Sequence, residues 1–382
     1  MTMSGTSVSV LVPTFNRAHY LGECLDSLLA QSVPPREIVV IDDGSEDATP
    51  EIVRAYGERI RYVRKENGGK PRAVNLGLSL AGGDLIWIFD DDDVALPDAI
   101  ETRLAALHAN PGAAFVYAPH YYGHDGPDGR IVRGRLHALP AHDPDRFFRD
   151  LMLGCFFHLA TALVPAALYR ELGGFDTELL SSEDYDMQLR LAHAHSAVQS
   201  AAPVFVFRQH TGPRGAKAIR YSGTQRSRVF RRFDQRVGQK LRASLPLGDY
   251  LVPRQAGPLD PVAMRAARLE RLAVMAGKGC LAEFFTDLGE LLADLRPGEG
   301  LGEGERRAIS GAVRGGYADA AILDEWPLVV DHVHGLRHHR CHGAAVRAMA
   351  HGFLALAAGY PGSAGERLKR LGVSLRLLAL SR

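Results

Sequence analysis

Short apolar runs alternate with amphipathic helical patterns through residues 1–120, and this alternation restricts the fold more than any other feature. The runs Val8–Val12 and Leu85–Phe89 are rich in Val, Ile and Leu, which is typical of strands buried on both faces of a parallel sheet. Between such runs, Ala18–Gln31 repeats leucines at helical spacing. This order predicts an α/β protein with a doubly wound, Rossmann-like sheet whose functional loops follow the carboxyl ends of the strands.

The other elements expected in residues 1–210 follow from the same periodicities and from turn signals. The run Asp125–Gly129 predicts the tip of a hairpin. Further strands are expected at Glu37–Ile41, Ile60–Arg64, Ala113–Tyr117, Ala160–Val164 and Ala202–Arg208. Further helices are expected at Ala48–Tyr56, Arg72–Leu80 and Ser182–His193, and after Pro97 and Pro165.

The composition changes after this core. Between Arg208 and Arg242 every charged residue except Asp234 is basic, and a stretch rich in Pro and Gly follows. From Pro261 onward the chain is rich in Ala and Leu with helical periodicity, and Asp260 is expected to cap the first helix. We therefore predict an α/β domain at residues 1–245, a linker at 246–260 and an all-helical region at 261–382.

Composition narrows the function and the location. The chain has 382 residues and a net charge of +1, so it lacks the strong positive field that bulk nucleic-acid binding needs. No run approaches the ~18 apolar residues of a membrane span, and no segment has the pattern of a signal peptide. Four scattered cysteines favour reduced thiols: they are Cys24, Cys155, Cys280 and Cys341. We expect a cytoplasmic protein, at most peripheral at the inner face of the membrane.

Five polar clusters stand where predicted strands end or a late helix begins. They are Pro13-Thr14-Phe15-Asn16-Arg17, Asp42-Asp43-Gly44-Ser45, Asn67-Gly68-Gly69-Lys70, Asp90-Asp91-Asp92-Asp93, and Gly173-Gly174-Phe175-Asp176 leading to Glu183-Asp184. With these motifs in this order, residues 7–210 resemble the family-2 glycosyltransferases of the GT-A fold. The resemblance does not extend to the helical region.

The run Asp90–Asp93 points to a cation. Adjacent carboxylates after a buried strand repel one another where they are desolvated, and a divalent ion would neutralise them. Oxygen ligands favour Mg²⁺ or Mn²⁺ over zinc. The resemblance implies an Asp-x-Asp pair, Asp90 and Asp92, that bridges the metal to a nucleotide diphosphate, with Asp92 as a direct ligand and His210 as a further one. Asp91-x-Asp93 offers a competing register, and an acidic helix cap is the structural alternative.

The resemblance assigns the other clusters to the nucleotide sugar and the acceptor. The residues implied to contact the nucleotide are Pro13, Thr14, Arg17, Asp42, Asp43, Asn67, Gly69, Lys70, Asp90 and Asp91. Asp184 is implied to be the general base, with Glu183 as its helper. Ordinary turns and helix caps explain the same residue types structurally, because Asp and Glu are favoured at helix starts by the helix dipole.

The resemblance implies an inverting, metal-dependent transfer of a sugar from a nucleotide diphosphate, with UDP favoured over dTDP or GDP. A glycan, a lipid-linked sugar, a peptide and a small natural product remain open as acceptors, and a retaining mechanism remains an alternative. A nucleotidyltransferase and an inactive binding scaffold are the rival functions. Basic and leucine residues interleave in Arg367–Arg382, so this terminal helix could pack on the tail, seat on a membrane or join a partner, including a second copy.

Overall fold

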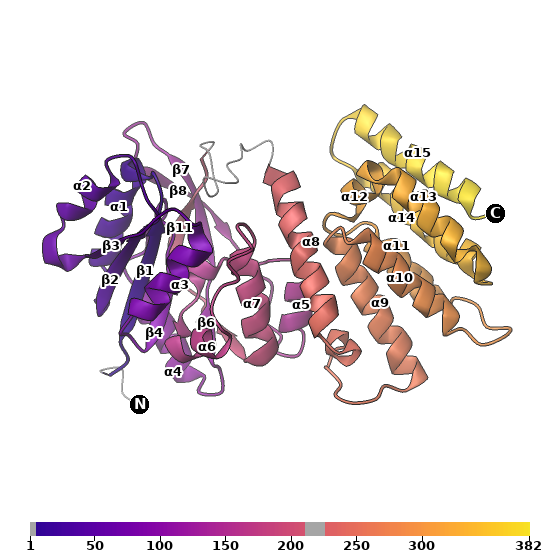
Figure 1. Cartoon of the computed structure of the whole chain (residues 1–382), viewed down its shortest axis with the longest axis horizontal. Coiled ribbons are helices and arrows are strands. Elements are labelled where there is room, and N and C mark those ends of the chain that lie inside the picture. The colour runs from indigo at the N-terminus through magenta and orange to yellow at the C-terminus, as the bar shows by residue number, and fades with distance from the viewer. Residues whose placement is uncertain (1–4, 211–225) are drawn as a thin grey trace. The chain divides into compact units, whose positions relative to one another are not determined.

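The computed structural model describes residues 5–210 and 226–382 (Figure 1). Contacts divide the chain into two units, one made of Met1–Phe148 with Cys155–Val229 and the other of Arg149–Gly154 with Phe230–Arg382. The sequence predicts a boundary at 245, whereas most of helix α8 (Arg226–Ser244) belongs to the second unit. The reason is polar packing, because Gln235 of α8 donates to the Gly279 carbonyl at 2.8 Å.

A five-stranded sheet forms the centre of the N-terminal unit. Its order is β3-β2-β1-β4-β9, with the first four strands parallel and β9 antiparallel to β4. The strands are β1 (Val8–Thr14), β2 (Glu37–Asp42), β3 (Arg61–Arg64), β4 (Leu85–Ile88) and β9 (Val164–Pro165). The strand order reverses between β1 and β4, the place where open α/β sheets bind ligands. The predicted doubly wound α/β sheet is therefore confirmed.

Helices and short 3₁₀ turns connect these strands, and Figure 1 shows α1, α2 and α3 beside them. They are α1 (Ala18–Leu29), α2 (Thr49–Arg54), η1 (Gly57–Arg59), α3 (Lys70–Leu80), α4 (Ala99–Ala109), η2 (Leu159–Thr161), α6 (Ala166–Glu171) and α7 (Glu183–Ala194). The apolar spacing of α1 buries Leu21, Leu25 and Leu28 in the core against the sheet. A further helix, α5 (Phe147–Leu153), crosses the boundary between the units.

A second sheet of four strands has the order β5-β11-β7-β8. Its strands are β5 (Val94–Ala95), β7 (His120–Asp125), β8 (Ile131–His137) and β11 (Phe205–Arg208), and β6 (Phe115–Tyr117) pairs separately with β10 (Ala197–Gln199). Strands β7 and β8 are antiparallel and form the predicted hairpin. The strand predicted at Ala160–Val164 is wrong over most of its length, since η2 occupies its first residues and β9 begins only at Val164.

The second unit is helical. After the short turn η4 (Leu247–Tyr250) it contains α9 (Pro261–Gly277), α10 (Leu281–Ala293), α11 (Glu303–Ala312), α12 (Ala318–Asp324), α13 (Trp326–Gly335), η5 (Leu336–His338), α14 (His342–Gly359) and α15 (Ala364–Leu380). Asp260 caps α9 as predicted, because its carboxylate accepts from the amides of Val262 and Ala263 at 2.9 and 2.8 Å. In the predicted linker, Tyr250 is fully buried.

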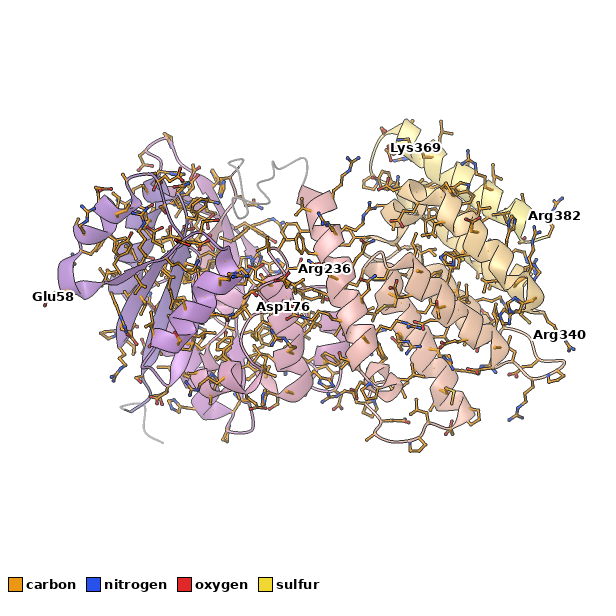
Figure 2. All side chains as sticks on the ribbon, in the orientation of Figure 1. Glu58, Asp176, Arg236, Arg340, Lys369 and Arg382 are labelled. Atoms are coloured by element: carbon orange, nitrogen blue, oxygen red, sulfur yellow. The ribbon has the colours of Figure 1, made fainter. Side chains whose placement is uncertain are left out.

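Helix α15 carries exposed basic side chains such as Lys369, and the exposed Arg382 follows the end of this helix (Figure 2). In the part of the chain that the structure describes, no helix combines the length and the apolar character that crossing a bilayer requires.

Candidate functional site

The loops after β1 and β2 are joined to each other at the carboxyl edge of the sheet. Asn16 has a φ of 55° in the left-handed region, and its side-chain oxygen accepts from the Glu46 amide at 2.7 Å. Its own amide donates to Ser45 Oγ at 2.9 Å. A strained, cross-linked backbone at this point fixes Arg17, the next residue, relative to the loop after β2.

The two aspartates that end β2 organise these loops. Asp42 is fully buried, and its carboxylate accepts from the Ser45 amide at 2.7 Å and from the Tyr62 hydroxyl at 2.5 Å. Asp43 accepts from Lys65 Nζ at 2.6 Å and from the amides of Gly68 and Gly69 at 2.9 and 2.7 Å. Gly69 has a φ of 90°, which only glycine adopts without strain, and α3 begins at the next residue.

Asn67 also bonds to Asp43, with its side-chain amide 2.8 Å from the Asp43 carbonyl oxygen. The loops after β2 and β3 are therefore joined into one unit, called here the loop pair, by the hydrogen bonds of Asp42, Asp43, Asn67 and Gly69. Pro13 and Thr14 lie beside it, because β1 pairs with β2 in the register Pro13↔Ile41 and Thr14↔Asp42.

The four consecutive aspartates have four different environments. Asp90 Oδ1 accepts from Lys70 Nζ at 2.5 Å. Asp91 is buried, and burial together with the charge of Asp92 raises its pKa to about 7, although Arg17 opposes the rise. Asp92 Oδ2 faces His210 and Arg17, and Asp93 Oδ1 accepts from the Arg208 amide at 2.8 Å. Asp91 and Asp92 form a turn in which the Asp93 amide donates to the Asp90 carbonyl at 3.3 Å, and this turn directs neighbouring carboxylates to different partners.

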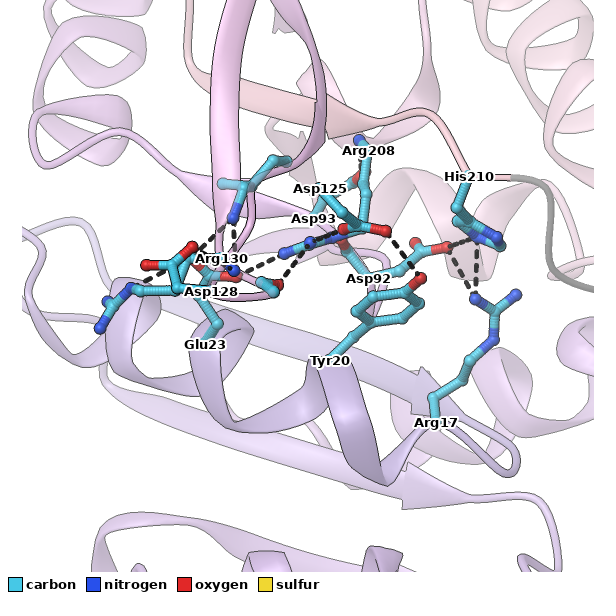
Figure 3. Close-up of polar contacts among 12 residues, drawn as sticks. Arg17, Tyr20, Glu23, Asp92, Asp93, Asp125, Asp128, Arg130, Arg208 and His210 are labelled. Carbon is cyan, nitrogen blue, oxygen red and sulfur yellow. Dashed lines mark hydrogen bonds and ion pairs between the residues drawn. The ribbon is translucent and has the colours of Figure 1, made fainter.

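Asp92 and His210 form the one pair of predicted metal ligands that the described contacts bring together (Figure 3). His210 Nε2 lies 2.9 Å from Asp92 Oδ2, close to the ~3 Å between neighbouring ligands of an octahedral ion with bonds of about 2.1 Å. Arg17 Nη1 lies 3.1 Å from the same Asp92 oxygen and 2.9 Å from the imidazole nitrogen, so the pair already attracts a cationic group.

An oxygen and an imidazole nitrogen suit Mn²⁺ or Mg²⁺ when a substrate diphosphate supplies further oxygens. No group of three or more His, Cys, Asp or Glu side chains able to hold a metal occurs within residues 5–210 and 226–382. Asp92 and His210 together offer one carboxylate oxygen and one imidazole nitrogen as ligand atoms. Asp90, the other predicted metal ligand, bonds to Lys70 instead.

The sequence analysis missed Arg208, whose fully buried guanidinium joins three segments (Figure 3). It forms ion pairs with Glu23 of α1 and Asp125 at the tip of the β7–β8 hairpin, and its Nε donates to the Asp92 carbonyl at 2.7 Å. The guanidinium carbon also lies 4.5 Å from the centre of the Tyr20 ring. Two charge partners on a buried arginine compensate its desolvation and hold the segment around Asp92 in place.

A small pocket lies beside the end of β4. Its lining combines apolar walls with one cation, one imidazole and three carboxylates: Lys70, Val74, Ile88, Asp90, His158, Leu159, Ala160, Phe175, Glu183 and Asp184. Phe175 is fixed to α3, because the Asn75 side chain both donates to its carbonyl and accepts from its amide, each at 2.8 Å. Phe175 therefore contributes a fixed apolar side chain to the pocket lining.

The charged groups of this pocket perturb one another. Burial raises the pKa of the Glu183 carboxyl to about 7, Asp184 adds to the rise, and Lys70 opposes it. Burial by itself would lower the pKa of Lys70, but Asp90, Glu183 and Asp184 raise it above its ordinary value. Such mutual perturbation in a pocket is typical of a functional site.

Helix α7 presents Glu183 and Asp184 from its first turn. The residue before them, Ser182, has a φ of 60°, so the helix begins from a strained backbone. One turn later, Asp186 binds Arg190 at 2.9 Å, and this arginine donates to the carbonyls of Leu172 and Gly174 at 2.8 Å. Arg190 thus links the first turns of α7 to the loop that contains Gly174.

The predicted site residues therefore fall into three neighbouring groups at one edge of the sheet. The loop pair and the end of β1 contain Pro13, Thr14, Asp42, Asp43, Asn67 and Gly69; the pocket contains Lys70, Asp90, Glu183 and Asp184; the remaining group contains Arg17, Asp91, Asp92 and His210. His158 in the pocket wall was missed by the sequence analysis, because an isolated histidine carries no signal in the sequence.

Comparisons with known proteins concern mainly the N-terminal half of the chain. Residues 9–171 match the family described as Glycosyl transferase family 2. An uncharacterised glycosyltransferase of Rickettsia prowazekii is 32% identical over 197 residues, which are 50% of this chain and 59% of the relative. Chondroitin synthase of Pasteurella multocida is 30% identical over 188 residues, which are 48% of this chain and 19% of that enzyme. The chain thus spans about three fifths or less of the length of these curated relatives.

Among solved structures, S. aureus TarS 1–349 in complex with UDP-GlcNAc is similar, with a TM-score of 0.52 and 19% identity. The similarity covers 85% of this chain and 90% of the TarS fragment, and at this identity it shows a shared fold. The parallel sheet with its polar carboxyl edge and the match over residues 9–171 lead to one conclusion: the N-terminal unit of this chain contains a domain that matches glycosyl transferase family 2 and has the GT-A fold.

Proposed function

We propose that the protein transfers a sugar from a nucleotide diphosphate to an acceptor hydroxyl. The observation that carries the proposal is the pocket at the end of β4, in which Glu183 and Asp184 face Lys70 and Asp90. Asp90 of this pocket is two residues from Asp92, which lies 2.9 Å from His210, and these two side chains are proposed to hold a cation shared with the donor. A site for a diphosphate beside a pocket with a carboxylate base is what sugar transfer from a nucleotide donor requires.

The donor nucleotide is proposed to lie along the loop after β1 and the loop pair after β2 and β3. The base and the ribose would lie against the loops that the buried Asp42 and Asp43 organise, with Pro13, Thr14 and Arg17 as one wall and Asn67, Gly69 and Lys70 as the other. UDP is the first nucleotide to test, because TarS has the same fold and was solved with UDP-GlcNAc. GDP and dTDP are the alternatives.

Asp92 and His210 are proposed to hold Mn²⁺ or Mg²⁺ together with the diphosphate oxygens of the donor. When bound, the ion would offset the negative charge of the departing nucleotide. Arg17, already in contact with both side chains, is placed to add a second positive charge beside the diphosphate.

Asp184 is proposed to accept the proton of the acceptor hydroxyl while its oxygen attacks the anomeric carbon. Glu183, with its pKa raised to about 7, is proposed to bind the acceptor beside it. Lys70 and Asp90, which both line the pocket, form an ion pair and neutralise each other's charge. Attack from the face opposite the nucleotide would invert the anomeric configuration.

The test uses Asp184→Asn, which keeps the shape of the side chain and removes the base. We expect hydrolysis or transfer from UDP-sugars with Mn²⁺ to fall by about 100-fold or more. Binding of UDP, measured by calorimetry, should stay within a factor of about two, because the nucleotide loops are untouched. Asp98→Asn is the matched control, since Asp98 stands exposed before α4 and makes no capping hydrogen bond.

Turnover of Asp184→Asn at the wild-type rate would show that another group is the base. Failure of the wild-type protein to hydrolyse or transfer from any UDP-, GDP- or dTDP-sugar would contradict the proposed activity itself. Release of pyrophosphate from a sugar phosphate and UTP would instead identify a nucleotidyltransferase.

A further inference from the structure

Helix α15 of the helical unit has an apolar outer face. Leu368 and Leu375 are 66% and 60% exposed, and at seven residues apart they lie on the same side of the helix. Ala379, one turn beyond Leu375, is exposed on that side as well, and Leu371 at its border is half-buried. We call the row formed by Leu368, Leu371 and Leu375 the leucine stripe.

The inner face of the same helix packs within the helical unit. Arg370 is buried and pairs with Asp319 of α12 at 2.6 Å. Ser374 Oγ donates to the Ala350 carbonyl of α14 at 2.8 Å, and Leu377 is fully buried. These contacts fix the rotation of α15 about its axis, so the leucine stripe faces outward.

Cations flank the leucine stripe on both sides. At about 100° per residue, Arg376 stands about 80° from Leu368 in one direction and Arg367 about 100° in the other. Both arginines are exposed, and neither has a carboxylate partner in the part of the chain that the structure describes. Arg367 donates to the Tyr360 carbonyl at 2.8 Å, and the Arg376 guanidinium lies 5.8 Å from the centre of the Trp326 ring.

The acidic side chain of α15 lies away from the leucine stripe. Glu366 is the single acidic residue of this helix and stands about 160° from Leu368. It pairs with Arg370 at 3.1 Å and with Lys369, labelled in Figure 2, at 2.7 Å. The outer surface of α15, all of whose residues the structure describes, therefore has an apolar centre, positive edges and no negative charge.

We propose that α15 docks on the surface of an anionic lipid bilayer, with its axis in the plane of the membrane and the leucine stripe among the acyl chains. A helix with an apolar centre and basic borders binds in this way, because burial of leucines and attraction to anionic headgroups both stabilise the bound state. The aliphatic stems of arginines can lie along the apolar region while their guanidinium groups reach the phosphates. The inference goes beyond the proposed sugar transfer, which requires no membrane.

The charges favour a bilayer over a second copy of the chain. A two-fold contact through α15 would place the same surface of both copies against each other. The positive edges at Arg367 and Arg376 would then meet with no outward carboxylate of α15 to compensate them. A neutral apolar groove of another protein would also leave these arginines without counter-charges, whereas anionic headgroups supply them on both sides of the helix.

The test measures how the full-length protein floats with lipid vesicles in a density gradient. The vesicles contain phosphatidylcholine alone, or phosphatidylcholine with about one third of anionic phosphatidylglycerol. We expect the wild type to float with the anionic vesicles at low salt, to be released as the salt concentration rises, and to stay largely unbound with the neutral ones.

Two double variants separate the apolar and the electrostatic contributions. Leu368→Gln/Leu375→Gln should weaken binding to the anionic vesicles by about 10-fold or more, because two leucines no longer enter the acyl region. Arg367→Gln/Arg376→Gln should weaken it by about 5-fold or more and make it less sensitive to salt, because two cations near the headgroups are removed.

Two further variants are matched controls. Val262→Gln replaces an apolar side chain that is 79% exposed at the start of α9. Arg54→Gln/Arg59→Gln removes two exposed arginines of the N-terminal unit, and Arg59, like Arg367, donates to a nearby backbone carbonyl, that of Tyr56. Both controls should float as the wild type does. The melting temperature of every variant should stay within about 2 °C of the wild type, because the altered side chains are exposed.

Absence of the wild type from the floated anionic vesicles would overturn the proposal and assign the leucine stripe to a protein groove with an acidic rim. Equal flotation of Leu368→Gln/Leu375→Gln and the wild type would overturn it as well, because the stripe would not be the element that binds. A dimer in light scattering that this double variant dissociates would show that a second copy covers the stripe.

Discussion

His120 shows how a single residue ties the stability of the N-terminal unit to pH. Its ring is fully buried and stacks on Phe205 at 5.2 Å, and neither nitrogen has a hydrogen-bond partner in the described part of the chain. Burial, together with the charges of His158 and His137, lowers the pKa of His120 to about 3. The folded protein keeps this ring neutral, while the unfolded chain binds a proton below about pH 6.5. Stability is therefore lost as pH falls through this window.

Replacing His120 with Phe should remove this effect, because the ring keeps its stacking and loses its titration. At about pH 5 the neutral histidine costs about 2 kcal/mol relative to neutral pH. We expect His120→Phe to lose less stability than the wild type by about that amount between about pH 7.5 and pH 5, in denaturant titrations. His124→Gln, an exposed change on the same strand, should follow the wild type. An unchanged pH profile in His120→Phe would show that other groups cause the acid loss.

For single residues, the sequence could predict which ones come together at the site. It could not predict the hydrogen-bond and ion-pair partners of each one. The positions after β1, β2 and β4 follow from the strand pattern alone. The directions of Asp90 to Asp93 do not, because they depend on partners far along the chain, such as Lys70 and His210. Arg208 and Glu23 are 185 residues apart, so only the fold brings their charges together.

At the scale of elements, local patterns failed where tertiary hydrogen bonds decide the backbone. The apolar run Ala160–Val164 has the composition of a strand. In the structure, Trp87 Nε1 donates to the Ala160 carbonyl at 2.7 Å, and Arg103 Nη1 lies 3.2 Å from the Thr161 carbonyl oxygen. These buried donors satisfy the carbonyls that a strand would pair, so η2 forms instead. Such donors come from distant segments and leave no local signal.

A ladder of ion pairs joins helices α8, α9 and α10 in the helical unit. Asp287 of α10 is fully buried and accepts from Arg242 at 2.9 Å and from Arg271 at 2.6 Å. Neighbouring rungs pair Arg268 with Glu290 and Asp294. Because one carboxylate serves two arginines from two helices, its charge determines the stability of the contact between these helices.

Asp287→Asn should lower the free energy of unfolding of the helical unit by about 2–4 kcal/mol, since two arginines would lose their shared counter-charge. Circular dichroism during denaturant unfolding measures this loss. Glu303→Gln is the control, because Glu303 pairs with Arg307 at 3.5 Å on the surface and should change stability by less than about 0.5 kcal/mol. Equal losses in the two variants would mean that burial of the Asp287 pair contributes nothing.

For the whole molecule, the sequence could predict an α/β part followed by helices but not where one unit ends. The Pro and Gly residues between Pro246 and Pro258 look like a linker, yet Tyr250 is buried and α8 packs mainly within the helical unit. A high content of Pro and Gly suggests a flexible segment. Whether that segment packs depends instead on the apolar and charged surfaces that it meets in the fold. Residues 149–154, far upstream, also join the helical unit, and no pattern in the sequence predicts this.

The central claim is that a nucleotide diphosphate binds at the carboxyl ends of β1 and β4 with a cation shared by Asp92 and His210. Crystals grown with UDP and manganese, with anomalous diffraction recorded for the metal, test it most directly. The account predicts one strong manganese peak in contact with Asp92, His210 and the diphosphate, with the base beside Asp42 and Asp43. A manganese peak elsewhere, or UDP bound away from this edge of the sheet, would contradict it.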